Sequence, residues 1–405
     1  MRQPPDVFDV VIVGGGPAGA TAAHEMARSG HRTLLLDRAG RTKPCGGAIP
    51  PRLIRDFEIP SELIVARINS ARMVAPSGRR VDMPVGDGFV GMVDRDVFDE
   101  WLRARAARAG AERRVGIFQR IERDADGSAI VQYAAGGSRS GVLESVRARM
   151  VIGADGALSA VARQEIRGAS KVKHVFAYHE VVRSPDAASA NDSFAEQRCD
   201  IYYQGKLSPD FYAWIFPHGP TTSIGTGSLH KGFGLRNAVA QLRADTKLVD
   251  AVTIRREGAP IPIAPLPRWD NGRDVVVAGD AAGVVAPASG EGIYYAMTGG
   301  RYAAHAVSAA LAATSSRAAA RELAGYRRRF MREHGAVFRI LGIMQWFWYA
   351  SDARRERFVA ICDDRDVQRL TFDAYTEKKL VRAKPMAHMR IFFKNVAHLT
   401  GLARA

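Results

Sequence analysis

The 405-residue sequence has only three cysteines, Cys45, Cys199 and Cys362, and they lie far apart. This number and spacing exclude a disulfide framework and a cysteine metal cluster, and we predict no metal site. No run of 18 apolar residues could form a transmembrane helix, and no signal-peptide pattern precedes the first predicted strand. Internal repeats and low-complexity linkers are absent as well. These absences predict a folded cytoplasmic protein.

Acidic residues are few relative to basic ones, which gives the chain a formal net charge of +16. Residues 317–405 hold 19 lysines and arginines against nine acidic residues, an excess of ten. A basic surface favours an anionic partner such as a nucleic acid, an acidic membrane face or a diphosphate. Because no nucleic-acid motif accompanies the charge, we expect peripheral association with an anionic membrane or binding of a phosphate, and no nucleic acid.

The first strand and the loop after it form the clearest motif. Residues 10–13 are an unbroken β-branched run, which predicts a strand buried on both faces. Gly14, Gly16 and Gly19 follow with the spacing G-x-G-x-x-G. The first glycine allows a tight turn, the second lets a pyrophosphate approach the backbone, and the third lets a helix lie close to the strand.

The predicted helix begins at Pro17 and Ala18 and ends near Gly30, so its first amides would face the phosphates. A second buried strand at 33–36 then leads to Asp37. An acid about 20 residues past the glycines suits a ribose hydroxyl pair. Strand, loop, helix, strand and acid in this order predict a dinucleotide site in place of a simple tight turn.

Two later strands, at 150–153 and 274–278, also end in glycine and an acid. The turns after them contain Asp155, Gly156, Gly279 and Asp280. A helix is predicted from about Gly292 to residue 312, with its amino end toward whatever the preceding loop binds. Three strands with the same ending make a chance arrangement improbable.

Residues 41–51 contain two glycines and end in two prolines, which predicts a loop without helix or strand. Cys45 precedes Gly46 and Gly47, whose lack of side chains would let a flat ligand lie against the backbone. An equally supported interpretation is a small buried cysteine in a turn.

Aromatic residues gather in residues 209–217, where a strand would place Tyr212, Trp214 and Phe216 on one face. The pattern alone favours an ordinary hydrophobic sheet face over an aromatic wall beside a substrate, because aromatic residues are common in strands. Near the end of the chain, residues 389–399 predict a basic amphipathic helix that packs on the protein or lies on a membrane.

The rest of the pattern predicts short elements. Strands are expected at 68–74, 80–83, 89–93, 114–118, 129–133, 147–152 and 252–256, with a strand-rich segment at 173–228, a proline-rich link at 260–267, and helices at 95–109, 234–245 and 321–349.

Taken in order, the glycine loop, residues 153–156 and residues 279–280 resemble the FAD enzymes of the para-hydroxybenzoate hydroxylase fold. The resemblance implies an α/β protein with a Rossmann-like FAD-binding domain, an interleaved β-sheet substrate domain and a helical, basic C-terminal region. The implied FAD-binding domain comprises residues 1–65, 94–168 and 270–315. The substrate domain comprises residues 66–93 and 169–269, and the helical C-terminal region comprises residues 316–405.

The same resemblance implies which residues bind FAD. Asp37 would hold the adenosine ribose, Arg95 would touch the phosphate or ribityl part, and Asp280 would hold the ribityl chain. The amides of Gly292 and Ile293 would face the pyrimidine end of the flavin. The full implied set is Gly14, Gly16, Pro17, Ala18, Gly19, Asp37, Arg38, Cys45, Gly46, Gly47, Arg95, Asp155, Gly156, Gly279, Asp280, Gly290, Gly292 and Ile293.

Two narrower signatures, Lys43-Pro44-Cys45-Gly46-Gly47 and Tyr212-x-Trp214-x-Phe216-Pro217, are similar to those of geranylgeranyl reductases of chlorophyll and bacteriochlorophyll synthesis. The similarity runs nearly end to end and includes residues 289–294 and 370–373. One departure is Asp37, where the broader family often has Glu. Such enzymes reduce three double bonds of a geranylgeranyl chain to phytyl, on the diphosphate or on the esterified pigment.

The implied chemistry is demanding, because nothing stabilises a carbanion on an isolated alkene. The implied route is protonation to a tertiary cation with hydride delivery from reduced flavin, in a dry site lined with aromatic faces. The resemblance therefore makes Tyr212, Trp214, Phe216 and Pro217 substrate-binding residues. Cys45 and Glu291 are the candidate catalytic proton donors, with a relayed water as an equal alternative, since thiols titrate near pH 8.5.

The implied electron donor is NADPH, or else reduced ferredoxin, and a pigment-esterifying synthase is an expected partner. Two rival functions stay open. An FAD monooxygenase or halogenase of the same fold would consume oxygen, and the aromatic strand is similar to the W-x-W-x-I-P of flavin halogenases. A non-catalytic carrier of prenyl lipid or pigment would bind lipid without turnover of the flavin.

Overall fold

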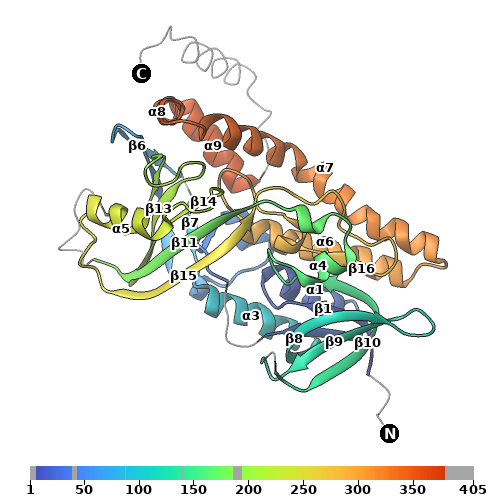
Figure 1. Ribbon diagram of the computed structural model, residues 1–405. Helices are drawn as coiled ribbons and strands as arrows, with labels where there is room; N and C mark the ends of the chain where they lie inside the picture. Colours follow the sequence, from blue (N-terminus) through green and yellow to red (C-terminus); the bar gives the residue numbers. More distant parts are fainter. Residues whose placement is uncertain (1–5, 39–42, 87, 139, 186–193, 379–405) are drawn as a thin grey trace. The chain divides into compact units, whose positions relative to one another are not determined.

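The computed structural model describes residues 6–38, 43–86, 88–138, 140–185 and 194–378. These residues form two compact units that interleave along the chain. The first unit comprises residues 1–43, 95–174 and 261–335, and the second comprises residues 44–94, 175–260 and 336–405. Helices and sheets are both prominent, which confirms the α/β class (Figure 1). In the structure, residues 44–65 group with the second unit, not with the FAD-binding part that the sequence assigned them to.

A parallel sheet forms the centre of the first unit. Strands β8, β2, β1, β10 and β16 lie side by side in this order and pair in parallel, and β9 pairs antiparallel with both β8 and β10. The bounds are β1 Val7–Val13, β2 Thr33–Asp37, β8 Glu112–Arg123, β9 Ala129–Ala135, β10 Leu143–Gly153 and β16 Val275–Val277. The predicted buried strand at 10–13 is confirmed, since β1 lies between two neighbours and its side chains there are buried.

Four helices accompany this sheet: α1 Pro17–Arg28, α3 Arg95–Arg108, α4 Ala160–Glu165 and α6 Ile293–Leu311. Helix α1 packs against both α3 and α6. A Cβ on Gly300 of α6 would lie 2.1 Å from the carbonyl oxygen of Ala18, so the two helix backbones approach closely here. Short 3₁₀ helices cover Ala169–Lys171 and Gly279–Ala282.

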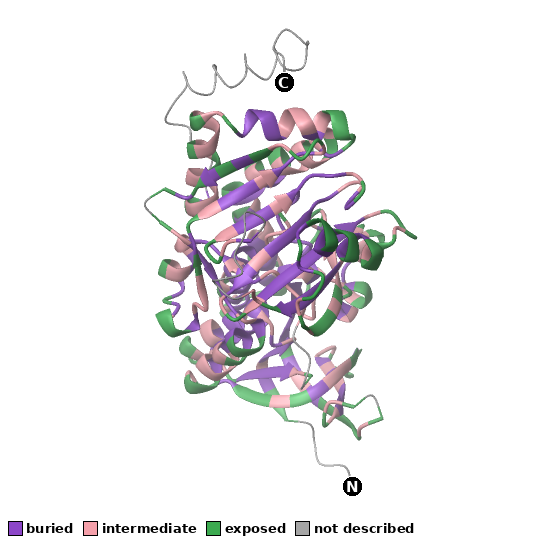
Figure 2. Ribbon diagram, turned by 90° about the vertical axis from the view of Figure 1, so that its left-hand side faces the viewer, coloured by how far each residue is buried: buried purple, intermediate pink, exposed green. Residues whose placement is uncertain are grey.

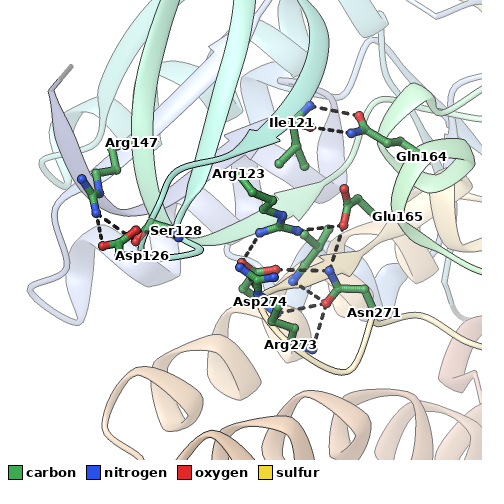
Figure 3. A network of polar contacts seen from close by, with 11 residues as sticks. Ile121, Arg123, Asp126, Ser128, Arg147, Gln164, Glu165, Asn271, Arg273 and Asp274 are labelled. Carbon is green, nitrogen blue, oxygen red and sulfur yellow. Dashed lines mark hydrogen bonds and ion pairs between the residues drawn. The ribbon is translucent and has the colours of Figure 1, made fainter. Parts of the chain in front are cut away.

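A polar network joins β8, α4 and the loop before β16 in the first unit (Figure 3). Arg123 donates to Glu165 at 2.9 Å and also pairs with Asp274. The Asn271 side chain donates to Glu165 at 2.9 Å and to Asp274 at 3.2 Å. Because these side chains are half-buried or more, the network fixes β16 and the turn that follows it.

The second unit contains a seven-stranded sheet in the order β15-β11-β14-β13-β12-β5-β6. The bounds are β5 Ser70–Val74, β6 Arg80–Pro84, β11 His174–Arg183, β12 Arg198–Tyr202, β13 Ala213–His218, β14 Thr221–Ser228 and β15 Thr253–Pro262. Helix α5, Leu235–Asp245, packs on β14 and contributes Val239 and Leu242 to a buried apolar cluster. Buried residues concentrate in the strands (Figure 2).

Three predictions for this unit were wrong in detail. Strand β15 continues through Pro260 and Pro262, predicted as a link, because an edge strand tolerates missing amide donors. The predicted strand at 68–74 is two strands, β4 Ala66–Ile68 and β5, in different sheets. The predicted loop at 41–51 contains strand β3, Ala48–Ile49, which pairs with β7, Val90–Met92, and residues 44–65 therefore belong to this unit.

Helices dominate the remainder of the described chain. The bounds are α2 Pro51–Asp56, α7 Ser316–Trp348, α8 Asp352–Ile361 and α9 Arg365–Glu377, with a 3₁₀ helix at Ser61–Leu63. Helix α2 begins at Pro51, as proline at a first helical position allows. The amphipathic helix predicted at 389–399 lies outside the described residues. Within the described part, no helix has the length and apolar character needed to cross a bilayer.

Candidate functional site

The three glycine-containing turns converge at the carboxyl edge of the parallel sheet in the first unit. The amide of Ala154 donates to the carbonyl of Val13 at 2.7 Å, and the amide of Ala278 donates to Gly153 at 2.9 Å. A Cβ on Gly279 would lie 2.7 Å from the Cβ of Ala18 in the first turn of α1. Ligand sites of open α/β sheets occur at such an edge.

Two glycines of the first loop are required by packing within the chain. Gly14 has φ +104°, and a Cβ there would lie 2.4 Å from the carbonyl oxygen of Ala154. A Cβ on Gly19 would lie 1.8 Å from the carbonyl oxygen of Gly14. Both contacts are with backbone atoms, which cannot move aside cheaply.

Gly16 is different, because a Cβ there would meet nothing within 4 Å and its φ of −74° suits any residue. The open space lies at the amino end of α1, where no side-chain hydrogen bond caps the helix and Pro17 is the first helical residue. Uncapped amides beside open space fit the pyrophosphate of a dinucleotide.

Asp37 lies over this loop. A Cβ on Gly15 would lie 2.7 Å from the Asp37 carboxylate. Arg103 of α3 reaches the same place, with Nη1 3.4 Å from Asp37 Oδ2 and 3.3 Å from the carbonyl oxygen of Gly15. The half-buried carboxylate remains available to a ribose, whereas Arg38 beside it is exposed. Sequence reasoning missed Arg103, because nothing in the sequence marks which residue of α3 faces the loop.

Asp155 caps a helix with its side chain. The carboxylate accepts hydrogen bonds from the Ser159 hydroxyl and from the amides of Ala160, at 2.6 Å, and Val161, at 3.2 Å. Burial raises the pKa of Asp155, and these three donors oppose that shift. Any contact from Asp155 and Gly156 to a cofactor therefore falls to their backbone.

Asp280 lies at the amino end of α6, where a Cβ on Gly292 would lie 3.7 Å from its Oδ1. Lys43 forms an ion pair with Asp280. This lysine opens the Lys43-Pro44-Cys45-Gly46-Gly47 signature, and sequence reasoning gave it no role of its own. The N-cap residue Gly292 has no side chain to cap α6, and the helix begins at Ile293, beside Asp280.

The loop before α6 is tightly turned. Gly290 has φ +67° and donates to the carbonyl of Ala286 at 3.0 Å, and Ala286 in turn donates to Glu291 at 2.8 Å. Ala288 also has a positive φ, +63°, which is uncommon for a residue with a Cβ.

Arg95 is nearly buried and makes a bidentate ion pair with Asp99, one turn further along α3, at 2.8 and 2.7 Å. The pair fixes the guanidinium at the start of this helix. The predicted contact of Arg95 with the cofactor stays a prediction.

The second unit brings the two narrower signatures into contact. A Cβ on Gly46 would lie 2.9 Å from the ring of Phe216. Gly47 has φ +69°, and a Cβ there would lie 2.5 Å from the carbonyl oxygen of Val93 and 2.6 Å from Nε2 of His218. The Cys45 sulfur is half-buried and accepts from the amide of Gly47 at 3.4 Å. These glycines therefore serve close packing of the Cys45 loop on β13.

Tyr212, Trp214 and Phe216 form a continuous aromatic row, as the alternation predicts. The ring centroids of Tyr212 and Trp214 are 5.9 Å apart, and those of Trp214 and Phe216 are 6.0 Å apart. Tyr212 also stacks on Phe211 at 4.2 Å. Burial raises the pKa of Tyr212, so its hydroxyl stays protonated at neutral pH.

The residues around the row were missed by sequence reasoning. A Cβ on Gly225 of β14 would lie 2.3 Å from the Trp214 ring, so this glycine makes room for the indole. His218, directly after Pro217, is buried, and its Nδ1 lies 3.0 Å from the carbonyl oxygen of Phe216. Burial lowers the pKa of His218, which favours the neutral imidazole. The sequence features that could have indicated them are the histidine directly after Pro217 and the glycine at position 225 in the next strand.

Comparison with known proteins extends this description. Residues 8–189 match a family model described as pyridine nucleotide-disulphide oxidoreductase. The chain is 55% identical over 395 residues to a geranylgeranyl diphosphate reductase of Rhodobacter capsulatus, covering 98% of both chains. A solved structure of a geranylgeranyl bacteriochlorophyll reductase-like protein from Thermoplasma acidophilum is similar with a TM-score of 0.81 and 22% identity, covering 97% of this chain and 99% of that one. A flavin-dependent brominase is similar with a TM-score of 0.71 and 16% identity, covering 98% and 100%.

The fold and the glycine site thus define an FAD-dependent oxidoreductase of the para-hydroxybenzoate hydroxylase type. The open space at Gly16, the carboxylate of Asp37 and the uncapped amides at Gly292 fit such a cofactor. The identity over nearly the full chain is more specific: the chain belongs to the geranylgeranyl reductase family.

Proposed function

We propose that the protein reduces three double bonds of a geranylgeranyl chain to give phytyl. The chain would be carried by a free diphosphate or by a bacteriochlorophyll-type pigment, and a pigment-esterifying synthase would be the partner that uses or supplies it. The observation that carries the proposal is the contact of Gly46 with Phe216, because it joins the cysteine loop to the aromatic row.

The aromatic row supplies what the reaction needs. Protonation of a trisubstituted alkene creates a tertiary cation, and the faces of Tyr212, Trp214 and Phe216 stabilise positive charge without acting as bases. All three rings are buried or nearly so, which excludes the water that would trap the cation. Pro217 ends the row and borders the buried His218.

The proton would come from the Cys45 loop, by way of the thiol or a water that it holds. Glu291 is the second candidate, and its place beside Gly290 and Gly292 in the loop before α6 suits a cofactor-binding role equally well.

FAD would be held by the convergent turns of the first unit, with the pyrophosphate at Gly16, the ribose at Asp37 and the ribityl chain at Asp280. When bound and reduced, FAD supplies the hydride. Lys43, paired with Asp280, would place a positive charge beside the cofactor. NADPH is the proposed electron donor, with reduced ferredoxin as the competing one.

A membrane surface is the proposed location of the substrate, and the second half of α7 supports this. Its outer face carries Ile340, Ile343 and Trp346, and the Trp346 side chain is 75% exposed. No acidic residue occurs between 334 and 350, and the Arg354 guanidinium lies 4.5 Å from the centroid of the Phe347 ring. Exposed tryptophan and isoleucine beside arginine are typical of helices that lie in an anionic membrane interface.

The proposal is tested by the visible spectrum of the protein with bound FAD. Dithionite without oxygen should bleach the flavin bands, and geranylgeranyl diphosphate should restore them with formation of a reduced prenyl product. Bands that return only with oxygen would favour a monooxygenase or halogenase. Tight prenyl binding without reoxidation would favour a carrier, and either result would overturn the proposed reaction.

The variant Gly46→Ala sharpens this test. Its backbone conformation accepts alanine, but the new Cβ would displace the Phe216 ring, so prenyl-dependent reoxidation should slow by about tenfold or more with flavin content unchanged. Gly88→Ala is the matched control, because its nearest neighbour, Pro51, is 4.0 Å away. Equal rates in both variants would contradict the role of the Gly46–Phe216 contact.

A further inference from the structure

Behind the aromatic row, four side chains from four neighbouring strands form a continuous chain of hydrogen bonds. Trp214 Nε1 lies 3.1 Å from Ser223 Oγ, and Ser223 Oγ lies 2.8 Å from Nδ1 of His179. Nε2 of His179 lies 3.1 Å from Oε2 of Glu257. The strands are β13, β14, β11 and β15, which are consecutive in the sheet.

The sheet register explains why these side chains meet. Gly225 of β14 is directly opposite both His179 of β11 and Trp214 of β13. A Cβ on Gly225 would lie 2.3 Å from the indole and 2.6 Å from the Cβ of His179. The indole and imidazole centroids are 6.5 Å apart. Ser223, two residues before Gly225 and on the same face of β14, bridges the gap that the glycine leaves.

For a neutral His179 imidazole, the two end groups set the direction of each hydrogen bond. An indole N–H only donates, and an ionised carboxylate only accepts. Ser223 therefore accepts from Trp214 and donates to Nδ1 of His179, and Nε2–H of His179 donates to Glu257. This bond to His179 contributes most to lowering the pKa of Glu257, consistent with an ionised end of the chain.

The chain cannot pass a proton into the aromatic row, because it ends on a nitrogen that has no lone pair to accept one. The hydrogen-bond chain can instead fix the orientation of the Trp214 indole. Trp214, Ser223 and His179 are all buried, so each broken link would leave a polar group without a partner. Glu257 is the one member near the surface, with 30% of its side chain exposed.

We propose that Ser223, His179 and Glu257 are positioning residues that fix the indole of Trp214 in the aromatic row and thereby set the affinity for the prenyl chain. The fixing of the indole is independent of the proposed function, whereas the effect on prenyl affinity rests on it. The other titratable groups near His179 are Arg255, 3.5 Å from Glu257 on β15, and His218 on β13. Glu180, next to His179, is instead bound to Arg243 of α5.

The test uses the indole N–H signals of the full-length FAD-bound protein labelled with ¹⁵N-tryptophan. The chain has five tryptophans, and Trp214→Phe identifies the signal of Trp214. Ser223→Ala, His179→Gln and Glu257→Ala should each move that signal and speed its hydrogen exchange by about tenfold. Ser184→Ala is the control, since the Ser184 hydroxyl pairs with Thr222 and is not part of the hydrogen-bond chain from Trp214 to Glu257. An unmoved Trp214 signal in Glu257→Ala would overturn the coupling.

Substrate affinity is measured in parallel. Each variant should raise KM for geranylgeranyl diphosphate by about 5–30-fold, and kcat should fall as well, because Trp214 also faces the cation of the proposed reaction. The double variant of Ser223→Ala and His179→Gln should be no worse than either single one, because both cut the same chain. Additive increases in KM in the double variant would contradict a single hydrogen-bond chain.

The experiment remains informative if the buried variants do not fold or if prenyl reduction is absent. Should the buried variants fail to fold, Glu257→Ala and its partner Glu257→Gln carry the test, because the glutamine oxygen still accepts from His179 and should restore the native signal and KM. The indole signals need no substrate, so they report on the chain even when prenyl reduction is absent. A shifted indole with unchanged KM would refute the role in prenyl affinity alone.

Discussion

At the scale of single residues, the three glycines of the first loop have two kinds of neighbourhood. Gly14 and Gly19 face backbone carbonyls at less than van der Waals distance, whereas Gly16 faces open space. Packing within the protein requires glycine at positions 14 and 19, whereas at position 16 it does not. A requirement for glycine at position 16 must therefore come from a ligand.

Gly16→Ala should lose FAD and keep its fold. Alanine fits the backbone at this position and costs the free energy of unfolding at most about 1 kcal/mol, the usual loss for alanine at a helix amino end. A pyrophosphate bound as proposed, however, would need the space that the methyl group takes. Flavin content after gel filtration and urea unfolding of the apoprotein measure the two effects. A variant that retains stoichiometric FAD would show that the phosphates lie elsewhere.

At the scale of elements, the contact of α1 with α6 sets the positions of two uncapped helix ends. Both helices begin at the carboxyl edge of the parallel sheet, and Gly300 allows their backbones to approach. The helix amino ends are thus fixed relative to one another by one small residue in the interior of α6.

Gly300→Ala and Gly342→Ala should change stability in opposite directions, although both place alanine inside a helix. The first puts a methyl group 2.1 Å from the carbonyl oxygen of Ala18 and should destabilise by about 1–3 kcal/mol. The second meets no atom within 4 Å in α7 and should stabilise by about 0.5–1 kcal/mol. Denaturant unfolding of both variants is the measurement, and effects of the same sign would contradict the close approach of α1 and α6.

The pairing of β5 with β6 should depend on pH through Asp82. Arg72 donates to Asp82 at 2.6 and 2.8 Å, and these hydrogen bonds lower the pKa of Asp82 from its ordinary value of 3.8. A lowered folded-state pKa gives stability that is present above pH 4 and is lost as the pH falls through the folded-state value.

Asp82→Asn should therefore lower the free energy of unfolding at pH 7 by no more than about 1 kcal/mol, because the carboxylate is half exposed. The difference from the parent protein should shrink toward zero as the pH falls through the lowered folded-state pKa of Asp82. Urea unfolding at several pH values follows it, and a difference that grows on acidification would show the opposite sign of coupling.

At the scale of the whole molecule, the excess of positive charge and an exposed apolar stripe fall in the same part of the sequence. Residues 317–405 hold ten of the 16 net charges, and the exposed stripe of Ile340, Ile343 and Trp346 lies in the same part of the chain. In the proposed membrane association, this charge would attract the protein to an anionic bilayer, and the stripe would supply an apolar contact that salt does not screen.

Two changes should weaken binding to vesicles of anionic phospholipid in different ways. Trp346→Ser should reduce binding at all salt concentrations, with Val142→Ser, an equally accessible valine elsewhere, as the control. Removal of residues 384–405 should reduce binding mainly at low salt, because it removes four basic residues and no acidic ones. Vesicle co-sedimentation measures both, and unchanged binding in both variants would exclude this surface as a membrane contact.

By itself, the sequence determined the fold class and the positions of the glycine turns, because buried β-branched runs and G-x-G-x-x-G spacing are local patterns. It also placed Tyr212, Trp214 and Phe216 on one face, since side chains alternate in a strand. Only the tertiary structure decided what those patterns meet: Arg103 over Asp37, the Asp155 carboxylate committed to α4, Phe216 against Gly46, and His179 behind Trp214. These partners lie 4 to 170 residues apart in the chain, and pairings across strands and loops depend on register and packing, which no local pattern encodes.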